Sequence, residues 1–436
     1  MIETDSGGFP VVVEDLDPDR LLTMLEESET QARRAERRKL RYALAWARLH
    51  PATTEEDAAT WGDLGGRDRD CDLRLGGEGT PEVEAFAAEP FAAALGISTR
   101  AGMALIADAL DLAHRLRRTQ QRVEDLEVAP WRARRLAQAT RSLSPEAAAY
   151  VDRVLAPVLD SCGPTRIEKV VDRARAEFDA VEQAEEETEQ AAGWGIRLHH
   201  GRLGRYAGTS LLEITGDTPT LTRFADLASS IAHEHLDPDH PDDPEDLARR
   251  KIAAVGEILD RAQGAAPGLS GATGTKTKLY LHLDADQLLD PTIGVGSAER
   301  LGPVTTSLIK QWLDQTKVTL QPVLRMDRAD AVDEHDPPAW MRELVILRDR
   351  TCIFPYCERN ARDCDLDHNE PYVAMDDGGP PGQTNPNNLA ALCRRHHRAK
   401  TFAGWTYTRI ADGTYTWHSP HGRAYTRKLS GTVTAH

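Results

Sequence analysis

Cys352-Ile-Phe-Pro-Tyr-Cys357, Cys364-Asp-Leu-Asp367-His368 and Cys393-Arg-Arg-His396-His397 stand in this order near the end of a 436-residue chain. They contain four of its six cysteines, together with aspartates and histidines. Thiols, imidazoles and carboxylates at such short spacing are the side chains with which proteins bind metal ions. Because Arg and Lys are interleaved with them, the segment indicates a metal-dependent hydrolase that acts on phosphodiesters.

The cysteines and one histidine predict a structural zinc site. Three thiols and one imidazole suit tetrahedral Zn2+, and the predicted ligands are Cys352, Cys357, Cys393 and His396. Two come from a turn and two from one helical face, since i and i+3 lie side by side on a helix. A disulfide or a set of buried thiols is the alternative, which a reducing compartment disfavours. Cys364 competes for a ligand position, but alternation along a strand places it opposite Asp367, so we expect a small core residue.

A second set of residues predicts the reacting groups. His368 can take a proton near neutral pH, and Asp367, on the other face of the same extended segment, can hold a hard divalent ion such as Mg2+ or Mn2+. A helix is predicted to open at Thr384-Asn-Pro386, with Asn388 early and His397 later along it. Lys400 could then reach the same phosphate as His397.

The roles of His396 and His397 are open at this point. Adjacent residues lie about 100° apart around a helix, so one imidazole can face the zinc and the other the catalytic ion. Both i+3 and i+4 reach the face that carries Cys393, so spacing alone does not assign them.

Together these residues resemble the HNH (ββα-metal) endonuclease pattern. The resemblance implies that His368 is the general base, that Asp367 and His397 bind the catalytic ion, and that Asn388 orients the base or joins the metal shell. It departs at His396, where many members have another cysteine. The tail from Gly404 to Arg423 is predicted to form a β-hairpin with an Asp-Gly turn, similar to the closing strands of actinobacterial-type members. Those members carry a long helical N-terminal domain of unknown function, which residues 20–326 resemble more loosely.

Charge is distributed unevenly along the chain. The whole sequence has 53 basic and 70 acidic residues, a net charge of -17. From residue 340 onward, 13 Lys and Arg face 10 Asp and Glu, so this end is cationic and the rest is acidic. A phosphate-rich partner such as DNA would therefore be steered to one end only.

Length and composition limit the number of domains and the cellular compartment. The length predicts two or three domains. No run approaches the roughly 18 apolar residues of a membrane span, and the first residues lack the features of a signal peptide. We therefore expect a cytoplasmic protein without a membrane partner, in which clustered cysteines bind metal.

The pattern of apolar residues predicts an α+β multidomain chain: a mainly α-helical N-terminal region with a small β-containing segment, followed by a zinc-stapled ββα-metal HNH module. The predicted parts are a flexible tail (1–15), a mostly helical carrier (16–263), a linker (264–277), a small α/β segment packed on the carrier (278–326), an acidic linker (327–338) and the HNH domain (339–436). Within the carrier, a long helix from Asp17 to about His50 and two strands at 196–200 and 211–215 are predicted.

Two functions from different classes fit the sequence. The first is a metal-dependent DNA endonuclease; the second is a non-catalytic nucleic-acid-binding or regulatory protein that uses the HNH fold as a zinc-stabilised platform. The helical region could target the protein, inhibit it or form a homo-oligomer. Its Gly96-Ile-Ser98 corner resembles a helix-turn-helix, which would be a separate DNA contact.

Overall fold

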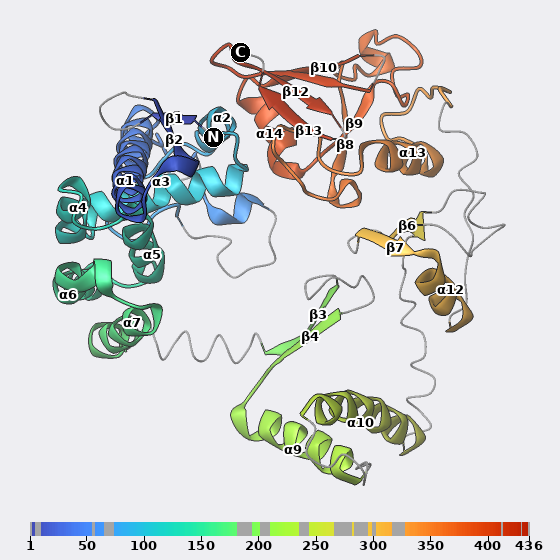
Figure 1. The fold of residues 1–436 in the computed structure, drawn as a ribbon. Coiled ribbons are helices and arrows are strands. Elements are labelled where there is room, and N and C mark those ends of the chain that lie inside the picture. The colour runs from blue at the N-terminus through green and yellow to red at the C-terminus, as the bar shows by residue number, and fades with distance from the viewer. Residues whose placement is uncertain are drawn as a thin grey trace. The chain divides into compact units, whose positions relative to one another are not determined.

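The computed structural model of the chain shows a mixture of helices and small antiparallel sheets (Figure 1). It falls into two units, one formed by Met1–Gln183 with Val323–His436 and the other by Ala184–Pro322. The residues that the structure describes are 2–4, 10–54, 57–64, 74–180, 194–200, 210–234, 244–265, 281–282, 295–298, 302–315, 328–410, 413–428 and 430–434.

The long first helix, α1 (Pro18–Leu49), begins and ends where the sequence predicts. The Asp17 side chain accepts a hydrogen bond from the Arg20 amide over 2.8 Å, so it caps the first turn. Before it, β1 (Ile2–Thr4) pairs with β2 (Pro10–Val12), and η1 spans Val13–Asp15. The expected flexible tail, 1–15, thus contains a short hairpin.

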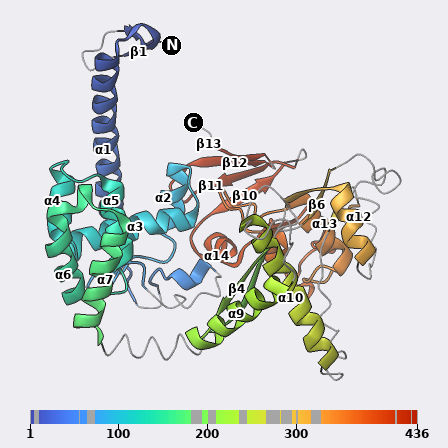
Figure 2. The ribbon, with the colours of Figure 1, turned by 60° about the horizontal axis from the view of Figure 1, so that its bottom comes forward.

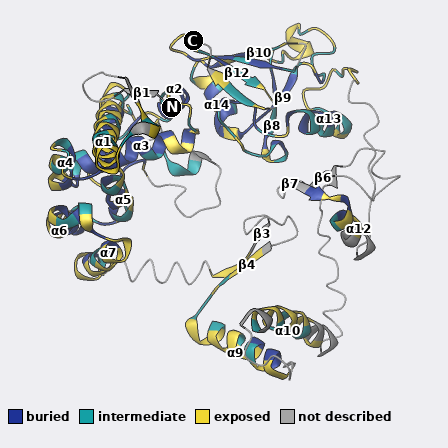
Figure 3. Ribbon diagram, viewed as in Figure 1, coloured by how far each residue is buried: buried dark blue, intermediate teal, exposed yellow. Residues whose placement is uncertain are grey.

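Helix α3 (Thr99–His114) is the centre of the helical region. It is buried along most of its length, as Figure 3 shows, and contacts α1 and other helices of this region. The surrounding elements are η2 (Trp61–Leu64), α2 (Ala88–Leu95), α4 (Arg117–Glu124), α5 (Pro130–Thr140), α6 (Pro145–Leu155), η4 (Ala156–Ser161) and α7 (Pro164–Phe178). Ala and Leu side chains at helical spacing supply the core.

The corner between α2 and α3 forms as predicted, but most of α3 is buried. Gly96 ends α2 in the left-handed conformation (φ 69°), and Ser98 caps α3 by accepting a bond from the Ala101 amide. A recognition helix must expose the face that enters the groove. The burial of most of α3 disfavours the helix-turn-helix interpretation.

The other unit has its own small core. It contains β3 (Gly195–His200), β4 (Ser210–Thr215), α9 (Thr218–Glu234), α10 (Pro244–Ala265), β5 (Leu281–His282), β6 (Val295–Ala298), β7 (Gly302–Thr305) and α12 (Thr306–Gln315). Ile231, Ala232 and Ala254 pack together between α9 and α10. The predicted carrier, 16–263, is therefore divided between the two units. Most of the predicted linker 264–277, and residues 316–326 of the predicted small α/β segment, lie outside the described residues.

The C-terminal part of the first unit places the candidate site. Its elements are α13 (Ala339–Asp349), η6 (Ala361–Asp363), β8 (Asp365–His368), η7 (Met375–Asp377), β9 (Leu389–Leu392), α14 (Arg394–Phe402), β10 (Thr406–Arg409), β11 (Tyr415–His418), β12 (Ala424–Lys428) and β13 (Gly431–Thr434). Strands β8 and β9 are antiparallel, with His368 opposite Leu389. The last four strands form a sheet in chain order, so the predicted hairpin is part of a larger sheet (Figure 2).

The prediction of a helix that begins at Thr384 is wrong. Asn388 lies in the turn before β9, and α14 begins only at Arg394. The run Leu389-Ala-Ala-Leu392 is fully buried and pairs with β8, while the Asp349 carboxylate accepts a hydrogen bond from the Ala391 amide. These partners satisfy the backbone of this run in the extended conformation, and its pairing with β8 selects the strand over the predicted helix.

Among the described residues, no single helix is long and apolar enough to cross a membrane. The pair α2 and α3, bent by 105° between them, meets that criterion only when both are counted together.

Candidate metal centre and adjoining polar site

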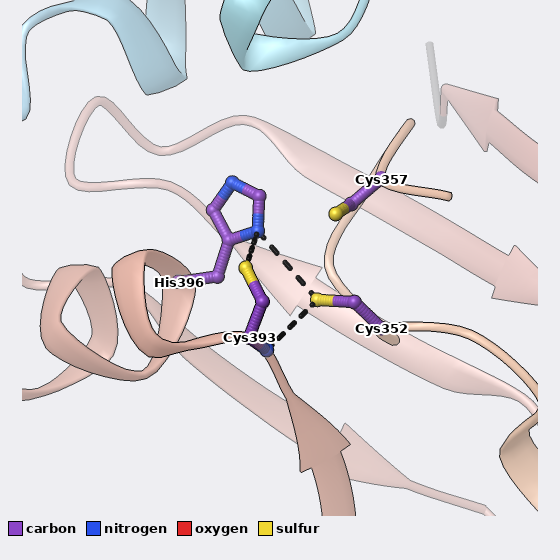
Figure 4. Close-up of side chains that lie close together, drawn as sticks. All are labelled: Cys352, Cys357, Cys393 and His396. Carbon is purple, nitrogen blue, oxygen red and sulfur yellow. Dashed lines mark hydrogen bonds between the residues drawn. The ribbon is translucent and has the colours of Figure 1, made fainter. Parts of the chain in front are cut away.

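Four side chains meet beside the start of α14. The ligand atoms of Cys352, Cys357, Cys393 and His396 all lie within 4.8 Å of one another. Cys352 and Cys357 come from the loop after α13, Cys393 is the N-cap of α14, and His396 lies in its first turn (Figure 4). The four residues that the sequence predicts as zinc ligands are therefore together, although the last two belong to a cap and a first turn instead of one helical face.

The imidazole of His396 points one nitrogen at the thiols. Its Nδ1 lies 3.1 Å from Sγ of Cys393 and 3.5 Å from Sγ of Cys352 (Figure 4). Phe354 stacks on the ring with centroids 3.9 Å apart, which fixes the ring plane. The Cys393 amide also donates to Sγ of Cys352. The centre is therefore held in shape by packing and by backbone contacts.

The charges in the cluster suit a cation. Hydrogen bonds from Cys352 and Cys357, and the nearby His396, lower the pKa of the Cys393 thiol far below its usual range. Burial, with hydrogen bonds to the neighbouring cysteines, raises the pKa of Cys352. A buried thiolate beside further thiols is stabilised by a bound metal, which also deprotonates the others.

The donor set fits a metal such as zinc. Three thiolates and one imidazole on a closed, largely buried cluster are typical of structural sites. The five cysteines that the structure describes are free thiols, so none forms a disulfide. Cys364 lies just before β8, buried, with its Sγ donating to the Asn360 carbonyl over 3.3 Å, outside the group of four.

A second polar site, separate from the cysteine cluster, is formed around His397. Oδ1 of Asp367 is 3.2 Å from Nε2 of His397, and Nδ1 of that ring is 3.1 Å from Oδ2 of Asp365. Oδ2 of Asp367 accepts hydrogen bonds from Lys400 over 2.7 Å and from the Tyr407 hydroxyl over 3.0 Å. His396 and His397 thus belong to different clusters.

These contacts set the charges of the site. Burial favours the neutral form of Asp367, but the hydrogen bonds from His397 and Lys400 outweigh it and lower the pKa of that carboxyl. The hydrogen bond to Asp367 raises the pKa of His397 against its burial, and Asp365 adds to the effect. The carboxylate is therefore ionised and the imidazole tends to be protonated.

His368 points away from Asp367 on the same strand. Its Nε2 lies 2.9 Å from Oγ1 of Thr384, and its ring centroid is 5.2 Å from that of His335 and 5.6 Å from that of Tyr372. Burial, and then the nearby His335, lower the pKa of His368. The imidazole is therefore neutral at neutral pH.

The side chain of Asn388 forms hydrogen bonds with the backbone of the loop between β8 and β9. Its Oδ1 accepts from the Glu370 amide over 2.8 Å, and its Nδ2 donates to the carbonyls of Glu370 and Gln383. It thereby joins the two ends of the loop between β8 and β9, next to the Thr384 that contacts His368.

Sequence reasoning missed several residues of these sites. Asp365 stands two residues before Asp367, on the same strand face, a spacing that could have revealed it. Tyr407, Thr384 and His335 carry no local signal, because each reaches the site from a separate segment.

Comparisons with known proteins identify relatives without a described activity. Uncharacterized protein Rv3776 of Mycobacterium tuberculosis is 28% identical over 315 residues, which cover 65% of this chain and 58% of the relative. Uncharacterized protein Rv2100 of the same organism is 35% identical over 155 residues, 35% of this chain and 27% of the relative. The matches thus span less than two thirds of either relative. No family model matches the chain, and no solved structure matches it.

Proposed function

We propose that the chain is a metal-dependent HNH endonuclease that hydrolyses DNA phosphodiester bonds. The observation that carries the proposal is the pairing of Asp367 with His397 at 3.2 Å, beside a neutral His368 on the same strand. The chain order of strand, strand and helix around these residues agrees with the ββα pattern.

The residues present fit a divalent ion. Asp367 and His397 would hold Mg2+ or Mn2+, and Asp365 would orient His397 through its other nitrogen, as carboxylates commonly do behind a metal-binding histidine. When bound, such an ion supplies positive charge to the scissile phosphate and to the leaving oxygen.

His368 would activate the water. Thr384 Oγ1 donates to the His335 carbonyl and can accept from Nε2–H of His368; in that tautomer Nδ1 is the unprotonated nitrogen and would accept the proton of the attacking water. Lys400, which also donates to the His368 carbonyl, adds positive charge near the phosphate. The cationic C-terminal part would attract DNA to this side. We place the reaction in the cytoplasm, where thiols stay reduced, and assign the four-residue Cys and His cluster to structural Zn2+.

Plasmid cleavage tests the proposal. Supercoiled DNA with Mg2+ or Mn2+ should be nicked or cut by the wild type, and His368→Ala should lose at least about 100-fold in rate. His418→Ala, an exposed histidine of β11, is the matched control and should cut normally. Equal background cleavage by the wild type and His368→Ala would refute the endonuclease. DNA binding without turnover under either ion would favour the non-catalytic platform.

A further inference from the structure

The imidazole of His396 is held from both sides. Its Nδ1 faces the cysteines, whereas its Nε2 lies 3.0 Å from Oγ1 of Thr99. Thr99 is the first residue of α3 and lies 297 positions away in the chain. Figure 4 shows the pale blue ribbon of the N-terminal helices on the side of the ring opposite the thiols.

We infer that Thr99 is a positioning residue of the metal centre, because its hydroxyl can accept the Nε2–H that His396 carries when Nδ1 binds the ion. A neutral imidazole carries one N–H. If Nε2–H donates to the Thr99 hydroxyl, Nδ1 keeps its lone pair toward the cluster. A hydrogen bond to the second nitrogen of a metal-binding histidine sets its tautomer and orientation and strengthens it as a ligand.

The place of Thr99 is determined by the helical region itself. Ser98 caps α3, and Gly102 lets α3 approach α2, since a Cβ at Gly102 would lie 2.6 Å from the Cβ of Ala92. Thr99 is buried, with 6% of its surface exposed. Its hydroxyl therefore has little freedom to turn away from His396.

A buried ion pair keeps α14 against this corner. Arg395, the residue before His396, pairs with Glu89 of α2, and their side chains are 2% and 0% exposed. Arg395 also donates to the Ala85 carbonyl over 2.6 Å. Two consecutive residues of α14 are thus fixed by α2 and α3. The metal centre is completed by residues of the helical region and is not a property of the C-terminal part alone.

The inference rests on metal binding by the four-residue cluster, but not on nuclease activity. The test uses the full chain loaded with Zn2+ or Co2+ and measures the dissociation constant for Zn2+ and the Co2+ absorption spectrum. Thr99→Val keeps the shape and removes the hydroxyl; it should weaken Zn2+ binding about 10- to 100-fold and shift the Co2+ bands. Thr99→Ser keeps the hydroxyl and should stay within about threefold of the wild type.

Thr119→Val is the matched control. Thr119 is a buried threonine of the same helical region whose hydroxyl bonds Asp152, far in sequence from the cluster. It should lose stability but retain Zn2+ affinity and the Co2+ spectrum. Wild-type affinity in Thr99→Val, or an equal loss in Thr119→Val, would overturn the inference.

A second variant covers the case in which Thr99→Val does not fold. Glu89→Gln releases Arg395 without touching the metal ligands, and it should accelerate Zn2+ transfer to a chelator; an unchanged transfer rate would count against the inference. None of these measurements uses DNA. A chain that retains Zn2+ but cuts no plasmid would refute only the proposed function.

Discussion

Asp367 and His397 face each other with 3.2 Å between Oδ1 and Nε2. The pairing raises the pKa of His397 and lowers that of Asp367 despite its burial. Without an ion, the imidazolium contributes stability that is complete below the ordinary histidine pKa and is lost as pH rises through the raised one. The carboxylate contributes stability above the ordinary aspartate pKa, and this is lost as pH falls through the lowered value.

The same pairing predicts pH-dependent ion binding. Mn2+ must displace the proton on Nε2, so its affinity should rise by up to about tenfold per pH unit until the pH passes the raised pKa of His397, while Asp367 stays ionised. Calorimetric titration of the Zn2+-loaded chain measures this. His397→Ala should bind weakly with a flat profile. An affinity independent of pH in the wild type would contradict the assignment of His397 as a ligand.

Removal of the metal from the four-residue cluster should destabilise the C-terminal part. Phe354 stacks on His396 and touches Trp405 and Trp417, with ring centroids 4.8 Å and 5.0 Å away. Chelation should therefore red-shift tryptophan emission and lower the melting temperature by roughly 10 °C. Cys352→Ser should melt like the chelated wild type. An unchanged melting temperature after verified loss of the metal would refute the structural role of the metal.

Breaking the buried pair of Glu89 and Arg395 should be costly. Glu89→Ala leaves a buried guanidinium without its carboxylate, and about 3–5 kcal/mol of unfolding free energy should be lost. Glu89→Leu combined with Arg395→Met removes both charges and should recover most of it. Denaturant unfolding of the three proteins gives the comparison. If the double variant is as unstable as the single one, packing and not charge dominates the contact.

His335 should tune the candidate base. Burial, followed by the charge of His335, lowers the pKa of His368. A lowered pKa keeps His368 unprotonated at more acidic pH, so the acidic limb of the pH–rate profile should lie below the ordinary histidine range. His335→Ala should move that limb to higher pH. An unmoved limb in an active variant would show that another group titrates there.

Short-range spacing carried most of what could be predicted. The cluster of Cys352, Cys357, Cys393 and His396 was predictable because each pair is close in the chain, so local geometry brings its ligands together. The start of α1 was predictable because Asp17-Pro18 has its own capping chemistry.

The features that the sequence did not predict depend on partners that are distant in the chain. Leu389-Ala-Ala-Leu392 suits a buried strand or a buried helix, and only its pairing with β8 selects the strand. Thr99 and Glu89 reach α14 from about 300 residues away in the chain, which no local pattern encodes. Tyr407 of β10 donates to Asp367 of β8 from 40 positions further along the chain.

Residues 395, 396 and 397 are consecutive in one short helix, so their side chains point about 100° apart and contact three different neighbours. Arg395 meets Glu89, His396 meets the cysteines, and His397 meets Asp367. One inserted or deleted residue in this turn would rotate all three contacts out of register at once. The spacing of this turn is therefore constrained by three separate contacts at once, to α2, to the cysteines and to β8.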